Sequence, residues 1–338
     1  MQDFFSFKNL HKAHKLCRKS KQHKFATIAF EIELGQNLVK LNETLEKNAY
    51  HLSKYRSFYI HDPKLRLIEA LPYKDRVVLM SFCKNVLEPR LENLLIYDNA
   101  ASRKNKGTDF AINRLHSFMH KLYIKNKSND FYFLKCDIKK YFQNINHDIL
   151  FKKLQKCGFT DNELSFMKMV IDSHGSVGLP LGNQTSQWFA LLYLDDVDRL
   201  IKEKFRIKYY VRYMDDFILL YEDKTYLQYC LEMIRKFCME NLKLELNQKT
   251  QIGKIKNGLD FLGFNHKMTS SGKIIKNVRS SAKRRERHYI KAIDRCYQAG
   301  LVNEEYLRVR QNAFEAHLKG TKEIHYVKKA FRKMKKIY

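Results

Sequence analysis

The sequence has few residues that would divide it into flexible parts. Its 338 residues include only 4 prolines and 12 glycines, and no proline follows Pro180. No low-complexity linker and no repeat with a period of about 20 to 50 residues is present. Because 44% of the residues are hydrophobic, we expect a globular protein with a sizeable core in two or three domain-sized units.

Metal-binding cysteine pairs and membrane segments are also missing. The seven cysteines form no C-x-x-C pair and no Cys/His cluster at zinc spacing, which predicts reduced thiols in a cytosolic protein. Residues 1–20 lack the apolar segment of a signal peptide, and charges interrupt nearly every apolar run before it could cross a bilayer. The uncharged stretch 173–194 contains GNQTSQ, so we expect no membrane span there.

Acidic residues are scarce relative to basic ones. The chain has 64 Lys and Arg against 36 Asp and Glu, a formal net charge of +28. Such a field attracts polyanions, so nucleic acid is the expected partner. The alternatives are an anionic membrane surface, which needs an amphipathic anchor, and a soluble basic protein without a focus of charge. Residues 267–338 carry 20 Lys or Arg and 6 Asp or Glu, and this concentration predicts a surface that follows a nucleic-acid backbone.

The apolar pattern predicts a mixed α+β region followed by an all-α region. Helices are expected in 25–55, in the segment that includes Pro89, and in 147–172, 187–204, 225–241 and 280–338. Strands are expected in 131–137 and 259–264, and residues 207–222 predict two strands around a tight turn. Residues 61–74 contain two prolines and are predicted to form a loop.

Three aspartates lie where the predicted strands end or turn. Asp215 and Asp216 are adjacent in the turn of YVRYMDDF, and Asp137 ends the apolar strand FYFLKCD. Neighbours in a regular strand face opposite sides of a sheet, but a turn lets both carboxylates reach one cleft. Carboxylates that close repel each other unless a cation neutralises them, and hard oxygen ligands suit Mg²⁺. We therefore predict three acids that hold two ions for an in-line phosphoryl displacement, with a solvated hairpin turn as the alternative.

These segments resemble the motifs of reverse transcriptases. Tyr213-Met214-Asp215-Asp216 is similar to their Y-x-D-D box, and FLKCDIKKYF is similar to their first catalytic segment. Downstream, GLPLGNQTSQ, LELNQKT and GLDFLGF resemble the segment that supports template and incoming nucleotide, the next box, and the primer grip. Upstream, PYKDRVV and NAASRKNKGTDFAI resemble the fingers motifs of bacterial reverse transcriptases. The resemblance covers residues 60 to 265 and implies an RNA-directed DNA polymerase.

The resemblance also implies an architecture. It is the right-hand polymerase fold of the α+β class, with an antiparallel palm sheet and helical N-terminal and thumb regions. The implied regions are an N-terminal helical extension (1–60), fingers (61–130), a palm (131–265) and a basic helical thumb (266–338).

The subfamily depends on the second segment. Many reverse transcriptases have Q-G-x-x-x-S-P there, whereas this chain has LGNQTSQ at 181–187, which resembles diversity-generating retroelements. That resemblance implies error-prone copying of a template-repeat RNA into cDNA, chiefly at adenines, with a small basic helical-bundle accessory protein. It also implies the cytoplasm of a bacterial host or phage-infected cell. A retron, a group II intron-like or a phage-defence reverse transcriptase is the alternative, as is a non-catalytic nucleic-acid-binding relative.

Metal and sugar contacts follow from the same resemblance. Asp137, helped by the Ile138 backbone carbonyl, and Asp215 are the implied ligands of two Mg²⁺ ions, which Mn²⁺ can replace. Asp216 is expected to bind more weakly. Phe142 matches the steric gate whose ring excludes a ribose 2′-hydroxyl, so we expect dNTPs to be preferred over NTPs; ordinary core packing is the alternative role.

Basic residues are expected around the triphosphate. Arg103 and Lys106 match the paired basic positions of the bacterial fingers motif, with Lys74 nearby, although each could be a solvated surface charge. Lys249 in NQKT matches a position proposed to protonate the departing pyrophosphate, and a surface lysine is the equal alternative.

The LGNQTSQ segment supplies the remaining candidates. Leu181 replaces a Gln that could hydrogen-bond the nucleotide, so we expect weaker discrimination, unless Leu181 is a core leucine. Gly182 is expected to let the backbone approach the substrate, and Ser186 and Gln187 to position template or cap the following helix. HGSVG at 174–178 lacks the first glycine of a nucleophile elbow and predicts no hydrolase.

Overall fold

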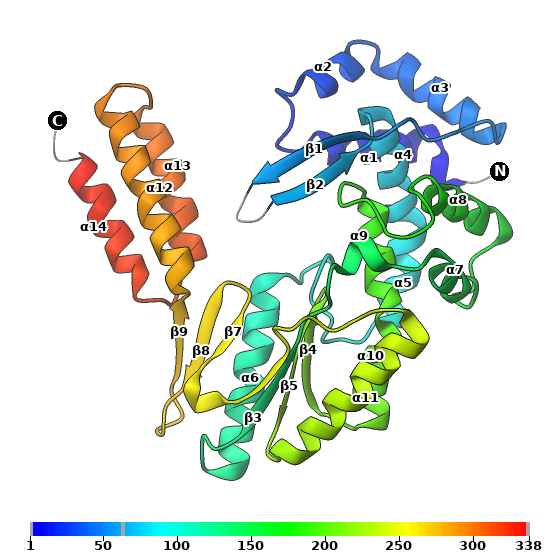
Figure 1. Cartoon of the computed structure of the whole chain (residues 1–338). Helices are drawn as coiled ribbons and strands as arrows, with labels where there is room; N and C mark the ends of the chain where they lie inside the picture. Colours follow the sequence, from blue (N-terminus) through cyan, green and yellow to red (C-terminus); the bar gives the residue numbers. More distant parts are fainter. Residues whose placement is uncertain (1–2, 62–64, 336–338) are drawn as a thin grey trace. The chain divides into compact units, whose positions relative to one another are not determined.

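Helices and strands are mixed along most of the chain, and helices alone follow Ser280 (Figure 1). The computed structural model describes residues 3–61 and 65–335. The α-helices are α1 (Phe7–Arg18), α2 (Phe25–Ile32), α3 (Leu34–Glu46), α4 (Tyr73–Phe82), α5 (Glu88–Leu94), α6 (Thr108–Asn126), α7 (His147–Gln155), α8 (Asp161–Asp172), α9 (Gln184–Tyr193), α10 (Asp195–Arg199), α11 (Lys224–Leu242), α12 (Ser280–Gln298), α13 (Glu304–His317) and α14 (Glu323–Lys335). Short 3-10 turns cover η1 (Asp3–Phe5), η3 (Tyr141–Asn144) and η5 (Ile255–Asn257), and π-helical turns cover η2 (Cys83–Leu87) and η4 (Leu200–Lys204).

The strands form three sheets with antiparallel pairing. They are β1 (Arg56–His61), β2 (Leu65–Ala70), β3 (Tyr132–Cys136), β4 (Tyr209–Tyr213), β5 (Asp216–Tyr221), β6 (Gln251–Lys254), β7 (Leu259–Phe261), β8 (Phe264–Met268) and β9 (Ile274–Val278). β1 and β2 form a hairpin in which Arg56 pairs with Ala70. The largest sheet has the order β4-β5-β3-β6, with β3 antiparallel to β6, and β7, β8 and β9 form an antiparallel meander.

The chain divides into two compact units. The first consists of Met1–Ala111, Cys136–Phe217 and Tyr229–Thr250, and the second of Ile112–Lys135, Ile218–Gln228 and Gln251–Tyr338. All seven cysteines are free thiols, as the sequence predicts. Among the helices of the described ranges, none is long and apolar enough to cross a membrane.

Helix α9 is the centre of the first unit. Its sequence, QTSQWFALLY, carries no charge, and the segment from Trp188 to Tyr193 is buried. A helix that is apolar all round is stable only when other elements cover every face. Helices α4, α5, α7 and α10 pack against it, so the segment that precedes α9 is anchored to a rigid core.

A buried ion pair connects β4, α9 and α10. Arg212 of β4 and Asp198 of α10 are both 0% exposed, and the guanidinium donates two hydrogen bonds to the carboxylate, at 2.7 and 2.6 Å. The Tyr210 hydroxyl donates to the same carboxylate at 2.6 Å. Arg212 also donates to the carbonyls of Leu191 in α9 (3.0 Å) and Met214 in the β4–β5 turn (3.1 Å). These bonds offset the large desolvation penalty of two buried charges.

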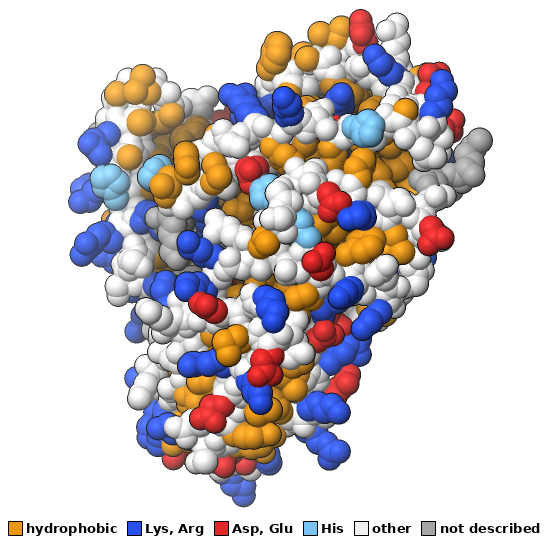
Figure 2. Space-filling view, turned by 45° about the vertical axis from the view of Figure 1, so that its right-hand side comes forward, with side chains coloured by type: hydrophobic (Ala, Val, Ile, Leu, Met, Phe, Trp, Pro, Cys, Tyr) orange, Lys and Arg blue, Asp and Glu red, His pale blue; other side chains and the backbone are white. Residues whose placement is uncertain are grey.

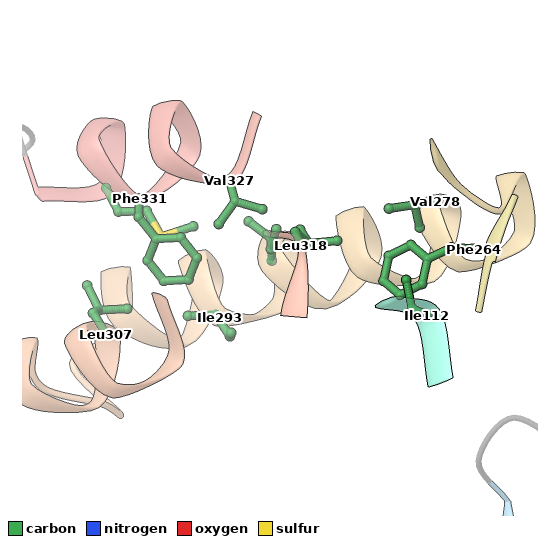
Figure 3. Packing of buried hydrophobic residues seen from close by; sticks show 10 residues of the cluster. Ile112, Phe264, Val278, Ile293, Leu307, Leu318, Val327 and Phe331 are labelled. Carbon is green, nitrogen blue, oxygen red and sulfur yellow. The ribbon is translucent and has the colours of Figure 1, made fainter. Parts of the chain in front are cut away.

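The C-terminal helices of the second unit share one apolar cluster. Figure 3 shows Val327 and Phe331 of α14 beside Leu307 of α13 and Ile293 of α12. Phe264 of β8 belongs to the same cluster, so the meander and the three helices are parts of one packed body.

Several sequence predictions needed correction. Residues 65–70, predicted as loop, form β2, because the prolines flank the strand rather than interrupt it. The helices predicted for 280–338 do begin at Ser280, whereas the first part of the region implied as a helical thumb, from residue 266, consists of strand residues up to Val278. The helix predicted for 147–172 is two helices, separated near Gly158, whose φ of 72° is left-handed. The helix that Pro89 is predicted to interrupt or end is interrupted by the π-helical turn Cys83–Leu87, and Pro89 lies in the first turn of α5, where the missing N–H is tolerated.

The buried pair leads to a stability prediction. Asp198→Ala leaves the Arg212 guanidinium buried without its carboxylate, so we expect the free energy of unfolding to fall by about 3–5 kcal/mol in urea titrations. Asp196→Ala is the matched control, because Asp196 is on the same helix and its surface ion pair with Lys153 is half exposed; its loss should change stability by at most about 1 kcal/mol. Equal effects of the two substitutions would contradict the importance of the buried pair.

Candidate active site

The three predicted aspartates lie at strand ends of the four-stranded sheet. Asp137 immediately follows β3, Asp216 begins β5, and Asp215 is in the two-residue turn between β4 and β5. β5 lies between β4 and β3 in the sheet order. The tight turn predicted from YMDDF is therefore confirmed.

The turn itself has an unusual backbone. Met214 has a φ of 55°, a left-handed conformation that is rare for residues with long side chains. Its carbonyl accepts a hydrogen bond from the buried Arg212 guanidinium at 3.1 Å. Backbone conformations of this kind persist where the surrounding structure fixes them, and they cluster at functional sites. Arg212 thus holds the turn that presents Asp215.

The carboxyl groups of Asp137 and Asp215 lie close enough to interact directly. Burial is the largest of the causes that raise the pKa of Asp215 to about 6, and the nearby carboxylates of Asp137 and Asp216 act in the same direction. Two carboxylates this close repel each other, so the folded protein holds the Asp215 proton more tightly. The structure therefore joins two of the three predicted acids in one partly buried, strongly acidic site.

The segment Leu244–Thr250 fixes Asp137 from the other side. The Asn247 N–H donates to the Asp137 carbonyl at 2.7 Å, and the Lys139 N–H donates to the Glu245 carbonyl at 2.9 Å. Ile138 and Leu246 form an antiparallel bridge between these two bonds. In this kind of pair the N–H and C=O of both residues point away from the partner strand. The Ile138 carbonyl is thus directed away from segment 244–250.

The chemistry of this pair fits a divalent cation. A cation bound by Asp137 and Asp215 would offset the repulsion between their carboxylates, and hard oxygen donors are what Mg²⁺ and Mn²⁺ prefer. Across residues 3–61 and 65–335, no group of three or more His, Cys, Asp or Glu side chains is arranged to hold an ion. The contribution of Asp216 and Ile138 to a metal site remains a prediction.

Phe142 lies beside the loop of the second motif. The Leu179 N–H donates to the Phe142 carbonyl at 2.7 Å, and the Gly178 N–H donates to the Ile145 carbonyl at 2.8 Å. The Phe142 ring is partly exposed and contacts Tyr141, with ring centroids 5.7 Å apart. Leu181 of the same loop is half-buried, and not part of the buried core.

The remaining residues of that loop have structural partners. A Cβ at Gly182 would lie 2.1 Å from the Glu69 carbonyl oxygen, so the close approach that this glycine allows is to β2 of the protein itself, not only to a substrate as predicted. Ser186 is buried within α9, whose N-cap is Asn183, so the predicted capping role of Ser186 is wrong. Gln187 accepts a hydrogen bond from Ser102 of the fingers motif at 3.1 Å.

The predicted phosphate-binding cations lie in different surroundings. Arg103 is buried, forms a bidentate pair with Glu92 at 2.8 and 2.7 Å, and donates to the carbonyls of Ile96 and Asn99. These contacts favour a structural role for Arg103 over the phosphate-binding role predicted from the sequence.

The predicted lysines keep more exposure. Lys106 donates to the Tyr97 carbonyl at 2.6 Å and lies over the rings of Tyr97 and Phe110. Lys74 is exposed at the start of α4. Lys249 is exposed in a turn whose Asn247 side chain accepts the Lys249 N–H at 3.1 Å, two residues after the bond to Asp137.

Basic side chains form stripes on two C-terminal helices. On α12, Arg284, His288, Lys291 and Arg295 are exposed at a spacing of three or four residues, opposite the buried Ile290 and Ile293. On α14, His325, Lys329 and Arg332 repeat this pattern opposite Val327 and Phe331. Figure 2 shows Lys and Arg side chains spread over much of one face of the molecule. The stripes match the charge concentration predicted for 267–338.

Sequence reasoning missed the residues that hold the site in place. Arg212 lies in the middle of the apolar strand YYVRYM, and a charge there can be buried only beside a counter-charge. That rule could have identified Arg212 as part of a buried pair. It could not have selected Asp198 among the three acids of LDDVDRL.

Comparison with known proteins identifies similar sequences and folds. The family model described as "Reverse transcriptase (RNA-dependent DNA polymerase)" matches residues 60–266. No curated protein matches the chain significantly. A telomerase from Candida albicans, in complex with a fragment of telomeric RNA, is 14% identical with a TM-score of 0.51, over 68% of this chain and 46% of that chain. A telomerase from Candida tropicalis with the same kind of RNA fragment is 12% identical with a TM-score of 0.52, over 84% of this chain and 61% of that chain. At this identity the likeness shows the fold alone, and the chain spans less than two thirds of either neighbour.

The shifted pKa of Asp215 leads to a prediction about pH. The folded-state pKa of about 6 is above the ordinary value of 3.8, so the folded protein binds the proton more tightly. The free energy of unfolding should therefore fall as pH rises from about 4 to about 6 and stay level above. Asp215→Asn removes this loss and should be more stable than wild type at pH 7.5 by about 1–3 kcal/mol, a difference that should disappear near pH 4.

Divalent metal extends this test. At pH 7.5, Mg²⁺ should raise the Tm of the wild type, because it binds the folded state, and should raise it less in Asp215→Asn. Asp172→Asn, whose carboxylate is 52% exposed, is the control and should respond to pH and Mg²⁺ as the wild type does. An Asp215→Asn protein with the wild-type pH profile and metal response would show that this carboxylate is neither strained nor a ligand.

Proposed function

The chain belongs to the reverse transcriptase family, whose model matches more than half of its length, and on that premise we propose that it is an RNA-directed DNA polymerase. The α+β polymerase fold expected from the sequence is confirmed by the family match and the solved structures. The observation that carries the proposed activity is the contact between Asp137 and Asp215, which come from the two segments that resemble catalytic motifs.

The proposed reaction joins a nucleotide to a primer 3′ end. Asp137 and Asp215 hold the divalent cations, with the Ile138 carbonyl and Asp216 as further ligands. We propose two Mg²⁺ ions, replaceable by Mn²⁺; when bound, they supply positive charge for the attacking 3′-oxygen and the leaving pyrophosphate. The raised pKa of Asp215 means that its carboxyl group loses its proton, and becomes ready to bind a cation, only as pH rises past about 6.

The proposed substrate is a deoxynucleoside triphosphate. The hydrogen bond between Leu179 and Phe142 supports a site in which the Phe142 ring excludes a ribose 2′-hydroxyl. Leu181 lines the same loop without a hydrogen-bonding side chain, which supports low discrimination between nucleotides. Lys249, on the segment bound to Asp137, is the proposed proton donor to pyrophosphate, and the exposed Lys74 and half-buried Lys106 are proposed triphosphate contacts.

The proposed macromolecular partners are a template RNA and its cDNA. The basic stripes of α12 and α14 and the net charge of +28 support binding to phosphate backbones without sequence preference. Two of the telomerase neighbours were solved with an RNA fragment, which agrees with this proposal for the shared fold.

The finer assignment is to diversity-generating retroelements. The LGNQTSQ segment supports error-prone copying at template adenines, and a small basic accessory protein is the proposed protein partner. A retron, group II intron-like or phage-defence reverse transcriptase has the same catalytic segments and is the second candidate. The free thiols of the seven cysteines agree with a reducing cytoplasm.

Primer extension tests the activity. The wild-type protein should extend a DNA primer on an RNA template with dNTPs and Mg²⁺. Asp137→Asn and Asp215→Asn should each lower the rate at least about a hundredfold, because each removes a charge that the transition state needs, while Asp216→Asn should have a smaller effect. The control Asp172→Asn should keep full activity. If the wild type binds the RNA–DNA hybrid without extending the primer, both alone and with the proteins encoded by neighbouring genes, the protein is better described as a non-catalytic relative of reverse transcriptases.

Sugar selection tests the role of Phe142. Replacing the ring in Phe142→Ala should lower the preference for dNTP over NTP by about 10- to 100-fold in kcat/KM, because the clash with the 2′-hydroxyl is lost. Phe142→Tyr keeps the bulk of the ring and should keep the preference. Single-nucleotide insertion kinetics with dCTP and CTP measure both, and unchanged selection by Phe142→Ala would assign the ring to packing alone.

A further inference from the structure

A directional chain of hydrogen bonds links the start of the β1–β2 hairpin to the loop before α9. Asn183 Nδ2 donates to the Tyr55 hydroxyl at 2.7 Å, and Tyr55 and Ser173 share a bond of 2.9 Å between their hydroxyls. Ser173 donates its only hydroxyl proton to the Val170 carbonyl at 2.7 Å, so Tyr55 must donate to Ser173. Each proton in this chain is used once, and the order Asn183, Tyr55, Ser173, Val170 is fixed.

A second contact links the other strand of the hairpin to the same loop. His174 Nε2 lies 2.5 Å from the Glu69 carboxylate, and the His174 ring packs edge-on against Tyr55 with centroids 6.0 Å apart. Gly182 lies so close to the Glu69 backbone that no side chain would fit between them. The loop between α8 and α9 therefore contacts β2 through both a side chain and the main chain.

Both contacts lie at one end of the hairpin. Tyr55 directly precedes β1, and Ser57 pairs with Glu69 in the register of the two strands. Away from this end β1 is exposed along its length, and Tyr59 is 66% exposed. The hairpin is thus held at its base, by Tyr55 just before β1 and by Glu69 of β2.

The far side of the same loop contacts the segment that carries Phe142. Gly178 and Leu179 donate their N–H groups to the carbonyls of Ile145 and Phe142, and His147 Nε2 donates to the Gly178 carbonyl at 2.6 Å. Residues 178–183 are therefore fixed between the base of the hairpin and the proposed sugar-selecting ring. A shift of the hairpin base would shift this loop.

Building on the proposed function, we propose that Tyr55, Asn183, His174 and Glu69 form a clamp that sets the position of residues 178–183 and so controls which nucleotides the polymerase accepts. These are positioning residues, because none of them lies in the acidic pair itself. Nucleotide affinity and discrimination depend on the placement of this loop, whereas the metal-binding acids are held separately by Arg212 and segment 244–250. The clamp should therefore affect KM and selectivity more than kcat.

The hydrogen bonding of Asn183 supports a role in placing the loop 178–183 that is separate from the metal-binding acids. Asn183 is the N-cap of α9 with extended backbone angles, the usual geometry for a side chain that caps the helix, yet it makes no cap hydrogen bond. Its amide is instead used by Tyr55. Without the Tyr55 hydroxyl, the Asn183 side chain loses this partner and is free to turn towards the N-terminus of α9.

Tyr55→Phe tests the clamp, because it removes one hydroxyl and keeps the ring. The expected result is a KM for the correct dNTP about tenfold higher, the scale of one to two hydrogen bonds, with kcat within about twofold of wild type and more frequent misincorporation. Faster amide hydrogen exchange in residues 178–183 should accompany it. Tyr59→Phe, which removes a hydroxyl from the exposed part of the same hairpin, is the matched control and should leave all three measurements unchanged.

Substitutions of His174 provide an independent test of the clamp. His174→Gln keeps a donor for Glu69 and should remain close to wild type, whereas His174→Leu should reproduce the Tyr55→Phe phenotype. Exchange measurements need no catalysis, so they test the clamp even if wild-type protein fails to extend primers, an outcome that would count against the proposed function alone. Unchanged exchange in Tyr55→Phe overturns the clamp. Faster exchange with unaltered KM and fidelity in an active enzyme also overturns the proposal, because the contacts would then be structural only.

Discussion

The buried pair of Arg212 and Asp198 is the constraint on which the proposed site depends. Both side chains are fully buried, and the pair is satisfied by Tyr210 and by the carbonyls of Leu191 and Met214. The backbone of Arg212 also donates a hydrogen bond to Asp98 and accepts one from Ala100 of the fingers motif. One residue therefore fixes the central helix, the motif NAASRKN and the turn that presents Asp215. The buried charges fix the relative positions of these elements, and their desolvation costs free energy.

The acidic site and the basic helices carry opposite charges and have different ligands in the proposed function. Burial raises the pKa of Asp215 to about 6, the nearby carboxylates of Asp137 and Asp216 act in the same direction, and a bound cation would offset this cost. Part of the excess positive charge lies on exposed faces of α12 and α14, opposite their apolar cores. In the proposed function these cations bind backbone phosphates, and the acids bind metal. The loop 178–183 belongs neither to the acidic site nor to the basic helices. Its position is fixed by neutral hydrogen bonds and the single His174–Glu69 pair.

Sequence reasoning predicted the local features of the site well, but it predicted poorly which residues hold the site in place. The YMDDF turn, the strand that ends at Asp137 and the helix over 225–241 follow from patterns within a few residues, and all three are present. Arg103 was assigned to phosphate from its motif, but its pairing with Glu92 depends on a contact that no local pattern encodes. The strands β1, β2, β6 and β9 were missed because each depends on its partner strand for stability. HGSVG lacks the first glycine of a nucleophile elbow, and the partner of His174, Glu69, lies 105 residues away in the sequence.

Binding of Mn²⁺ tests the central claim most directly, namely that Asp137 and Asp215 are held together to bind a divalent cation. Electron paramagnetic resonance titration of the full chain at pH 7.5, with a primer annealed to an RNA template, counts bound ions without requiring turnover. We predict bound Mn²⁺ in the wild type, loss of binding in both Asp137→Asn and Asp215→Asn, and loss in Asp198→Ala under conditions where that variant remains folded. Wild-type Mn²⁺ binding in both Asp137→Asn and Asp215→Asn would contradict the account.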